Sequence, residues 1–301
     1  MSPIISVVLP TYNGSKYISR SIDSVLNQSF SDIELIIVND CSTDNTLEII
    51  SKYASLDKRI KIINNLKNMK LPASLNIGFR HANGKYLTWT SDDNIYKPNA
   101  FSVMYNYLED HENIDFVSCN MDWVTENGEF IGKHSDWGDR STPLTLAWVC
   151  NVGACFLYKK EILKLVGEYD ESIFCAEDYD YWCRIALTRN MKYLKDNLYT
   201  DVSNKKSLSY THRNLADEMG DFVRHKYANL IIAKYANNYI DACVTYGRLK
   251  SKYPYFKSIP NFMCLGIFIF YIIPKFLTKF LPLKKWRHTL RDKLNGLNQD
   301  Y

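Results

Sequence analysis

The first ninety residues alternate between short apolar runs and longer stretches whose apolar positions recur at helical spacing. Short, nearly continuous apolar runs are typical of strands buried on both faces of a parallel sheet. Four such runs are present, at residues 5–10, 33–38, 60–63 and 86–90. The three stretches between them carry the apolar stripe of an amphipathic helix and end near residues 26, 56 and 82. This order predicts successive βαβ units and therefore a parallel sheet.

Polar side chains follow three of these predicted strands at the point where each strand ends. Residues 11–13 follow the first strand, Asp40 closes the second, and Asp92 and Asp93 follow the fourth. Parallel strands deliver their carboxyl ends to one edge of a sheet, and ligands of open α/β sheets bind outside that edge. We therefore expect the three loops to line one crevice.

The pair Asp92 and Asp93 suggests a cation site. Adjacent carboxylates repel each other, so water or a cation must compensate their charge. For an isolated pair, a solvated turn is the commoner explanation. Beside the other two loops, the pair favours Mg²⁺ or Mn²⁺ carrying a phosphate, because both cations prefer hard oxygen ligands.

The second part of the chain shows weaker patterns. A helix is expected from residue 98, and a polar loop at 134–142. Strands are expected at 115–120, 129–133 and 154–158, and further helices at 143–150 and over 215–250. Another helix begins near Glu177, which puts Asp178 close to a helix N-terminus beside aromatic side chains. Asp178 could serve there as a helix cap alone, or as a catalytic carboxylate.

Composition and charge narrow the class of protein. The 301 residues are 46% hydrophobic, enough for one substantial core or a main domain with a smaller appendage. The net charge of +4 is uneven, since residues 275–301 carry +5 and the other 274 carry −1. No nucleic-acid-binding face is therefore expected on the body. The eight cysteines lack zinc-site spacing and no secretory leader is evident, so we expect a cytoplasmic protein with reduced cysteines.

Several motifs in register resemble the family 2 glycosyltransferases of the GT-A fold. The segments that carry the resemblance are VVLPTYNG (7–14), SVLNQS (24–29), VNDCSTD (38–44), GKY (84–86), SDD (91–93) and ED (177–178). They cover roughly residues 4–200. The resemblance implies an α/β fold, with a mainly parallel sheet flanked by helices and a helical C-terminal extension. It also implies inverting transfer from a nucleoside-diphosphate sugar, such as a UDP- or dTDP-sugar.

The resemblance implies roles for named residues. Asp40 would accept a hydrogen bond from the imide N–H of a uracil or thymine, with the neighbouring segment Pro10, Thr11, Tyr12 and Asn13 completing the nucleotide site. Asp92 would lie near the ribose or the donor sugar, and Asp93 would bind the Mg²⁺ or Mn²⁺ that bridges the diphosphate. Asp178 would be the general base that takes a proton from the acceptor hydroxyl.

Two departures from the family pattern stand out. Asn39 replaces the first of two acidic residues, although Asp40 keeps the second. The Arg and His that often follow the Glu-Asp helix have no clear counterpart, and the candidates are His212 or Arg213. Asn76, Glu177 and His212 are therefore additional candidate site residues. The Q-x-x-R-W motif of processive synthases is absent from the sequence, which favours transfer of single residues.

Two other functions compete with glycosyl transfer. One is a nucleotidyltransferase, although its Gly-rich, Arg-bearing loop is missing after the first strand. The other is a non-catalytic scaffold that binds a nucleotide or a sugar.

The predicted organisation has three parts: a nucleotide-binding half (1–97), an acceptor half (98–210) and a helical region (211–301). Residues 262–273 are apolar but too few to span a bilayer, which takes about 20 residues. Basic residues and a Trp follow, so we expect an anchor on an anionic membrane surface at 260–291, with packing on the body or an oligomer contact as the alternatives. The expected acceptor is a saccharide, lipid-linked at the inner face of the cytoplasmic membrane, in assembly of a bacterial surface polysaccharide.

Overall fold

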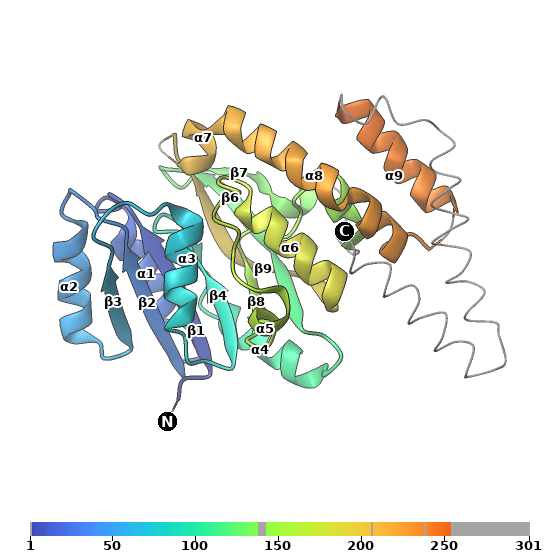
Figure 1. Cartoon of the computed structure of the whole chain (residues 1–301). Coiled ribbons are helices and arrows are strands. Elements are labelled where there is room, and N and C mark those ends of the chain that lie inside the picture. Colours follow the sequence, from blue (N-terminus) through green and yellow to red (C-terminus); the bar gives the residue numbers. More distant parts are fainter. Residues whose placement is uncertain (1, 138–142, 206, 238, 254–301) are drawn as a thin grey trace.

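The computed structural model describes residues 2–137, 143–205, 207–237 and 239–253 (Figure 1). Its strands are β1 (Ile5–Thr11), β2 (Ile33–Asn39), β3 (Ile60–Asn64), β4 (Tyr86–Trp89), β5 (Ile95–Tyr96), β6 (Phe116–Thr125), β7 (Phe130–Lys133), β8 (Phe156–Lys159) and β9 (Met191–Ser203). Its α-helices are α1 (Ile18–Leu26), α2 (Thr46–Leu56), α3 (Leu71–Arg80), α4 (Ala100–Asp110), α5 (Ile162–Val166), α6 (Glu177–Thr188), α7 (Leu208–Thr211), α8 (Arg213–Tyr235) and α9 (Tyr239–Lys252). Two short 3₁₀ helices are η1 (His134–Trp137) and η2 (Pro143–Ala147).

The first four strands form the predicted parallel unit. Their order is β3-β2-β1-β4, and β1 pairs in parallel with both β2 and β4. The register sets Thr11 opposite Asn39 and Val8 opposite Trp89, so the three strands end close together. We call the loops that leave these ends, residues 12–17, 40–45 and 90–94, the carboxyl edge.

The sheet continues beyond β4 with mixed pairing. The order runs on through β8, β6, β9 and β5, and β7 pairs with β6. Only β6 and β9 run parallel in this part; the β4–β8, β6–β8, β6–β7 and β5–β9 pairs are antiparallel. The sheet is therefore mixed as a whole, and its predicted parallel character belongs to the N-terminal half.

The second half differs from expectation at η2 and β9, among other elements. The helix predicted at residues 143–150 is the 3₁₀ turn η2, which ends at Ala147. The long strand β9 was not predicted, because charged and amide residues interrupt its apolar alternation at Lys195, Asp196 and Asn197. The register between β6 and β9 shifts near this point, which explains why a simple period of two fails.

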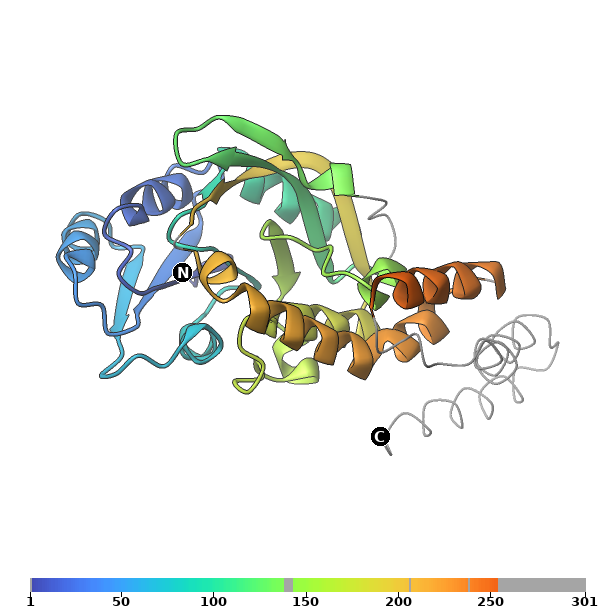
Figure 2. The same cartoon turned by 90° about the horizontal axis from the view of Figure 1, so that it is seen from above.

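Helices cover both faces of the sheet (Figures 1 and 2). Because side chains alternate along a strand, Val8 and Ile36 pack with α3 and α6 on one face, while Val7 and Leu35 pack with α1 and α4 on the other. All four side chains are fully buried. The carboxyl edge is therefore held by a rigid two-sided core.

The helices α8 and α9 share the core that contains α6. Tyr227 of α8 and Tyr246 of α9 belong to the same buried cluster as Tyr179 of α6 and Leu146 of η2. The Tyr227 hydroxyl also donates a hydrogen bond of 2.9 Å to Asp180 in α6. The described part of the C-terminal region is thus packed against α6 and η2.

Within the described residues, no helix has the length and apolar character needed to cross a membrane. The segment 260–291, predicted as a membrane anchor, lies outside the described residues.

Candidate active site

Direct hydrogen bonds join the loops of the carboxyl edge. Thr11 at the end of β1 donates from Oγ1 to Oδ2 of Asp92, at 2.5 Å. The Asn13 side chain accepts a hydrogen bond of 2.8 Å from the backbone N–H of Thr43 in the loop after β2. The backbone N–H of Asp40 donates to the carbonyl of Thr11 at 2.8 Å. The structure therefore brings together the three loops that the sequence placed at one edge.

Asp40 is buried and ordered by the segment before α3. Its Oδ1 accepts hydrogen bonds from Asn65 Nδ2 (2.8 Å) and Met69 N (2.7 Å), and its Oδ2 accepts one from Lys70 N (2.9 Å). An ionised carboxylate has about four acceptor positions, so Oδ2 retains the capacity for a further N–H donor. This oxygen could bind the edge of a nucleobase.

Three carboxylates gather where β4 and β9 end. Burial raises the pKa of Asp92 to about 7, and the neighbouring charge of Asp93 raises it further in the same direction. Burial also raises the pKa of Asp93, and that of Asp201 in β9 to about 6, with the charge of Asp93 adding to the latter shift. Asn204 opposes the rise at Asp93, since its Nδ2 donates to Asp93 Oδ2 at 3.1 Å.

Asp201 and Asn204 were missed from the sequence. Both lie in or just after β9, and β9 carries no strand pattern that would have placed them at this edge. The signal that was available is compositional: an Asp and an Asn at the end of an extended segment.

The oxygen-rich surroundings of Asp93 fit a divalent cation. Within the described part of the chain, no group of three or more His, Cys, Asp or Glu side chains has the arrangement of a complete metal site. Mg²⁺ usually takes only one or two protein carboxylates together with substrate phosphates and water. The site offers only part of a coordination shell of hard oxygens. Burial disfavours the charged form of its carboxyls, and a cation would stabilise that form. Such a site suits a cation that arrives with a phosphate.

Glu177 and Asp178 form a second acidic pair, at the N-terminus of α6. Asp178 Oδ1 accepts a hydrogen bond of 2.6 Å from the backbone N–H of Tyr179, and the Cys150 thiol lies 3.8 Å from its Oδ2. Burial raises the pKa of Asp178 and of Glu177, and at Glu177 the adjacent charge of Asp178 adds to the rise. Glu177 Oε2 is buried without a hydrogen-bond partner. A carboxyl whose pKa is raised binds a proton more readily than an exposed carboxyl does, as a general base requires.

Strained backbone lies in the loops that carry or border the candidate site residues. Among the described residues, four that are not glycine have a positive φ: Asn13 (55°), Cys41 (62°), Lys70 (71°) and Cys175 (72°). Each follows a strand of the carboxyl edge or precedes a helix of the site. Strained backbone is characteristic of functional sites, where the surrounding structure holds it in place.

The other predicted residues differ in their environment. Pro10 is buried within β1, whereas Tyr12 is 50% exposed at the edge. Asn76 is buried, and its amide is occupied by both backbone groups of Tyr169, at 2.8 and 2.9 Å, and by Glu171. Those contacts tie α3 to the loop before α6 and account for the position of Asn76 in structural terms.

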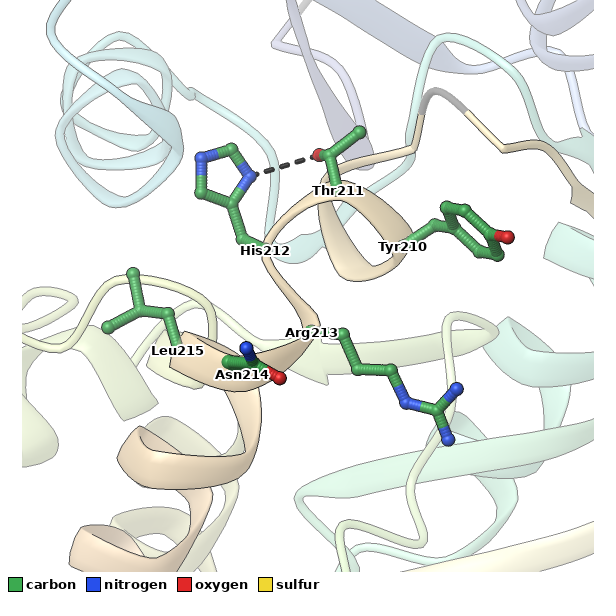
Figure 3. Close-up of a pocket in the computed structure, with 6 residues that line it drawn as sticks. All are labelled: Tyr210, Thr211, His212, Arg213, Asn214 and Leu215. Atoms are coloured by element: carbon green, nitrogen blue, oxygen red, sulfur yellow. Dashed lines mark hydrogen bonds between the residues drawn. The ribbon is translucent and has the colours of Figure 1, made fainter.

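His212 lies in the turn between α7 and α8. Its exposed ring is 5.7 Å from the ring of Phe174, edge to face, and its Nδ1 lies 3.0 Å from Thr211 Oγ1 (Figure 3). Residues 210–215 line a hollow of about 430 Å³ here. His212 and Arg213 point to opposite sides of the turn in Figure 3. Phe174 thus connects this turn to the loop that leads into Glu177.

The sequence of the chain is similar to sequences of known proteins. The model of the family described as Glycosyl transferase family 2 matches residues 6–167. An uncharacterized glycosyltransferase of Haemophilus influenzae is 33% identical over 195 residues, which are 61% of this chain and 60% of that protein. A chondroitin synthase of Pasteurella multocida is 30% identical over 202 residues, 66% of this chain and 20% of that protein. The chain therefore matches only part of the length of these relatives.

Solved structures share the fold at low sequence identity. TarS of Staphylococcus aureus, residues 1–349 in complex with UDP-GlcNAc, has a TM-score of 0.62 at 20% identity and covers 96% of this chain and 88% of its own. The mannosyltransferase PcManGT of Pyrobaculum calidifontis, in complex with GDP-Man and Mn²⁺, has a TM-score of 0.58 at 15% identity, over 97% and 85% of the two chains.

Proposed function

The chain belongs to glycosyl transferase family 2, and on this premise we propose that it transfers a sugar, with inversion, from a nucleoside-diphosphate sugar to a saccharide acceptor. The enzyme class, a glycosyltransferase, and the predicted GT-A type of fold are both confirmed by the comparisons. One observation supports a mechanism. The carboxyl edge, which bears Asp40 and Asp93, is connected through Lys70 to Phe174. Phe174 lies shortly before the helix that begins at Glu177 and bears Asp178.

The nucleotide would bind at the carboxyl edge. Asp40 Oδ2 has room for one more N–H donor, which a uracil or thymine imide supplies and which fixes the base. Tyr12 is exposed beside it, with a ring that a base can stack against. The TarS complexes with UDP and UDP-GlcNAc favour a uridine donor, while the PcManGT structure is a complex with GDP-Man.

A divalent cation would be held by Asp93, with Asp92, Asp201 and Asn204 around it. When bound, Mg²⁺ or Mn²⁺ neutralises the diphosphate and so makes it a better leaving group. Asp92 is held by Thr11, which orients its carboxyl for the ribose or the donor sugar. The Mn²⁺ in the PcManGT complex supports a cation of this kind.

Asp178 would act as the general base. Its carboxylate accepts the proton of the acceptor hydroxyl while that oxygen attacks the anomeric carbon from the side opposite the diphosphate. The bond from the anomeric carbon to the diphosphate oxygen breaks and the nucleoside diphosphate leaves, so the configuration inverts through an oxocarbenium-like state. The raised pKa of Asp178 makes it a better base than an exposed Asp.

The acceptor side is proposed on separate grounds. The relatives include chondroitin synthases, which are named for making polysaccharides. Residues 98–210 would bind a saccharide, and a lipid-linked acceptor would fit a basic, apolar segment at 260–291 that binds the inner surface of the cytoplasmic membrane. Residues 1–97 would then form the nucleotide half, and 211–301 a helical region that supports and anchors it.

A screen of nucleotide sugars tests this function. The purified protein is incubated with Mn²⁺ and each of a set of UDP-, dTDP- and GDP-sugars, and release of the nucleoside diphosphate is measured. We expect one donor to be hydrolysed slowly and to raise the Tm more than the others. If no nucleoside diphosphate or nucleotide sugar binds, the proposed function is wrong.

A further inference from the structure

Lys70 adopts a backbone conformation that is essentially reserved for glycine. Its φ is 71° and its ψ is 168°. In this region the Cβ of any other residue clashes with the backbone, so the conformation costs stability. Asn13, in contrast, belongs to the residue types that enter positive φ most readily. A lysine at position 70 therefore needs an explanation that a glycine would not.

The backbone contacts of Lys70 do not require a side chain. Its N–H donates to Asp40 Oδ2 at 2.9 Å and to Asn68 Oδ1 at 3.2 Å, while Met69 N donates to the other oxygen of Asp40. A glycine would offer the same N–H without the strain. The benefit of lysine must then come from its ammonium group.

The ammonium of Lys70 extends from Asp40 toward the catalytic helix. Its Nζ lies 6.0 Å from the centre of the Phe174 ring, and Phe174 precedes Glu177 by three residues. The side chain is exposed, and no carboxylate of the described residues forms an ion pair with it. Lys70 therefore lies between Asp40, which its backbone N–H contacts, and Phe174, which stands shortly before the acidic pair of α6 in the sequence.

The charges of the site favour an anionic ligand for this cation. When ionised, Asp92, Asp93 and Asp201 on one side and Asp178 on the other would repel a diphosphate. We infer that Lys70 binds the diphosphate of the donor, which offsets this repulsion together with the divalent cation. The inference rests on the proposed function, because it assigns Lys70 to the donor site of that reaction.

Isothermal titration with UDP and with UMP, in Mn²⁺, tests the inference in three variants. Lys70→Gly and Lys70→Gln remove the ammonium, and Lys67→Gln removes a charge from an exposed lysine of the same loop. We expect both Lys70 variants to bind UDP about ten- to hundredfold more weakly, as loss of a charge-assisted hydrogen bond would cause, and to lose less affinity for UMP. The UDP affinity of Lys67→Gln should stay within about twofold of the wild-type value, because an exposed charge outside the binding site contributes little to binding.

The Tm separates binding from folding. Lys70→Gly relieves the strain, so its Tm should equal or exceed that of the wild type while its UDP affinity falls. UDP affinities of both Lys70 variants within twofold of the wild-type value would overturn the inference and leave the proposed function standing. A wild-type protein that fails to bind UDP, or any other nucleoside diphosphate, would overturn the proposed function as well.

Discussion

Asn204 donates a hydrogen bond of 3.1 Å from Nδ2 to Oδ2 of Asp93, across 111 positions of sequence. The contact connects the end of β9 to the turn after β4. Burial raises the pKa of Asp93 and so disfavours its charged form. The hydrogen bond from the Asn204 amide lowers this pKa and so stabilises the charged form. Asn204 is therefore part of the machinery that keeps Asp93 ready for a cation.

Replacing Asn204 by Ala should weaken binding of Mn²⁺ in the presence of UDP by about three- to tenfold, the effect of losing one hydrogen bond of ordinary strength. The pKa of Asp93 would rise without the amide, so the loss of Mn²⁺ affinity should be larger at pH 6 than at pH 8, because protons compete with the cation more strongly at the lower pH. Free Mn²⁺, counted by electron paramagnetic resonance, measures this.

Asn190→Ala is the matched control. Asn190 also donates from Nδ2 to an oxygen at 2.9 Å, but it lies just before β9, at the opposite end of that strand, and its acceptor is the carbonyl of Asn113. Mn²⁺ affinity should be unchanged in this variant. An equal loss of affinity in both variants would remove Asn204 from the cation site.

Asp178→Asn should slow transfer strongly while keeping nucleotide binding. The amide cannot accept the acceptor proton, so the rate should fall by about 10²- to 10⁴-fold. Asp217→Asn, at an exposed position of α8, should leave the rate unchanged. UDP affinity and single-turnover transfer are the two measurements, and unchanged turnover in Asp178→Asn would exclude this residue as the base.

Glu177 should make the protein less stable as the pH rises. Burial, with the charge of Asp178, raises the pKa of Glu177 to about 8 from an ordinary value of 4.5. The folded state then holds a proton that the unfolded state has lost, so this contribution to stability is complete below about pH 4.5 and is lost as the pH rises toward 8. Glu177→Gln should therefore have a higher Tm than the wild type at pH 8, with the advantage shrinking toward pH 5.

Glu168→Gln is the control for this measurement of Tm against pH, because the pKa of Glu168 is shifted in the opposite direction. Arg80 lowers the pKa of the exposed Glu168, so this carboxyl stays charged in both states between pH 5 and 8. The difference in Tm between Glu168→Gln and the wild type should not change over that range. A Glu177→Gln difference that is equally flat would mean that Glu177 is ionised in the folded protein.

Gly14→Ala should disrupt the carboxyl edge through a single methyl group. A Cβ at position 14 would lie 2.2 Å from Asp92 Oδ2 and 2.5 Å from Thr11 Oγ1, so the hydrogen bond between those side chains would break. We expect UDP affinity to fall at least tenfold and the free energy of unfolding to fall by about 1–3 kcal/mol, as in other overpacked sites.

Gly247→Ala provides the comparison for this substitution. Gly247 lies in α9, and a Cβ there would meet no atom within 4 Å. The free energy of unfolding should rise by about 0.5–1 kcal/mol, and UDP affinity should not change. Chemical denaturation and calorimetric titration of both variants make the measurement; retained UDP affinity in Gly14→Ala would show that Asp92 has no part in donor binding.

The sequence predicted the half of the fold in which local pattern and tertiary structure agree. The strands that end at Thr11, Asn39 and Trp89 are buried on both faces, so their apolar runs were nearly continuous and their loops were placed at one edge. In β9, edge-like polar positions and a register shift hide the strand, and with it Asp201 and Asn204. The strain at Lys70 could not be predicted, because φ depends on contacts with Asp40 that form only in the folded chain.

Binding of UDP in the presence and absence of Mn²⁺, by the wild type and by Asp93→Ala, tests the central claim most directly. We expect UDP to raise the Tm of the wild type, with a further rise when Mn²⁺ is present. Asp93→Ala should keep the first rise and lose the second, because the base contacts at Asp40 remain while the cation loses its carboxylate. A Tm that responds to no nucleoside diphosphate, or an Mn²⁺-dependent rise that survives in Asp93→Ala, would contradict the account.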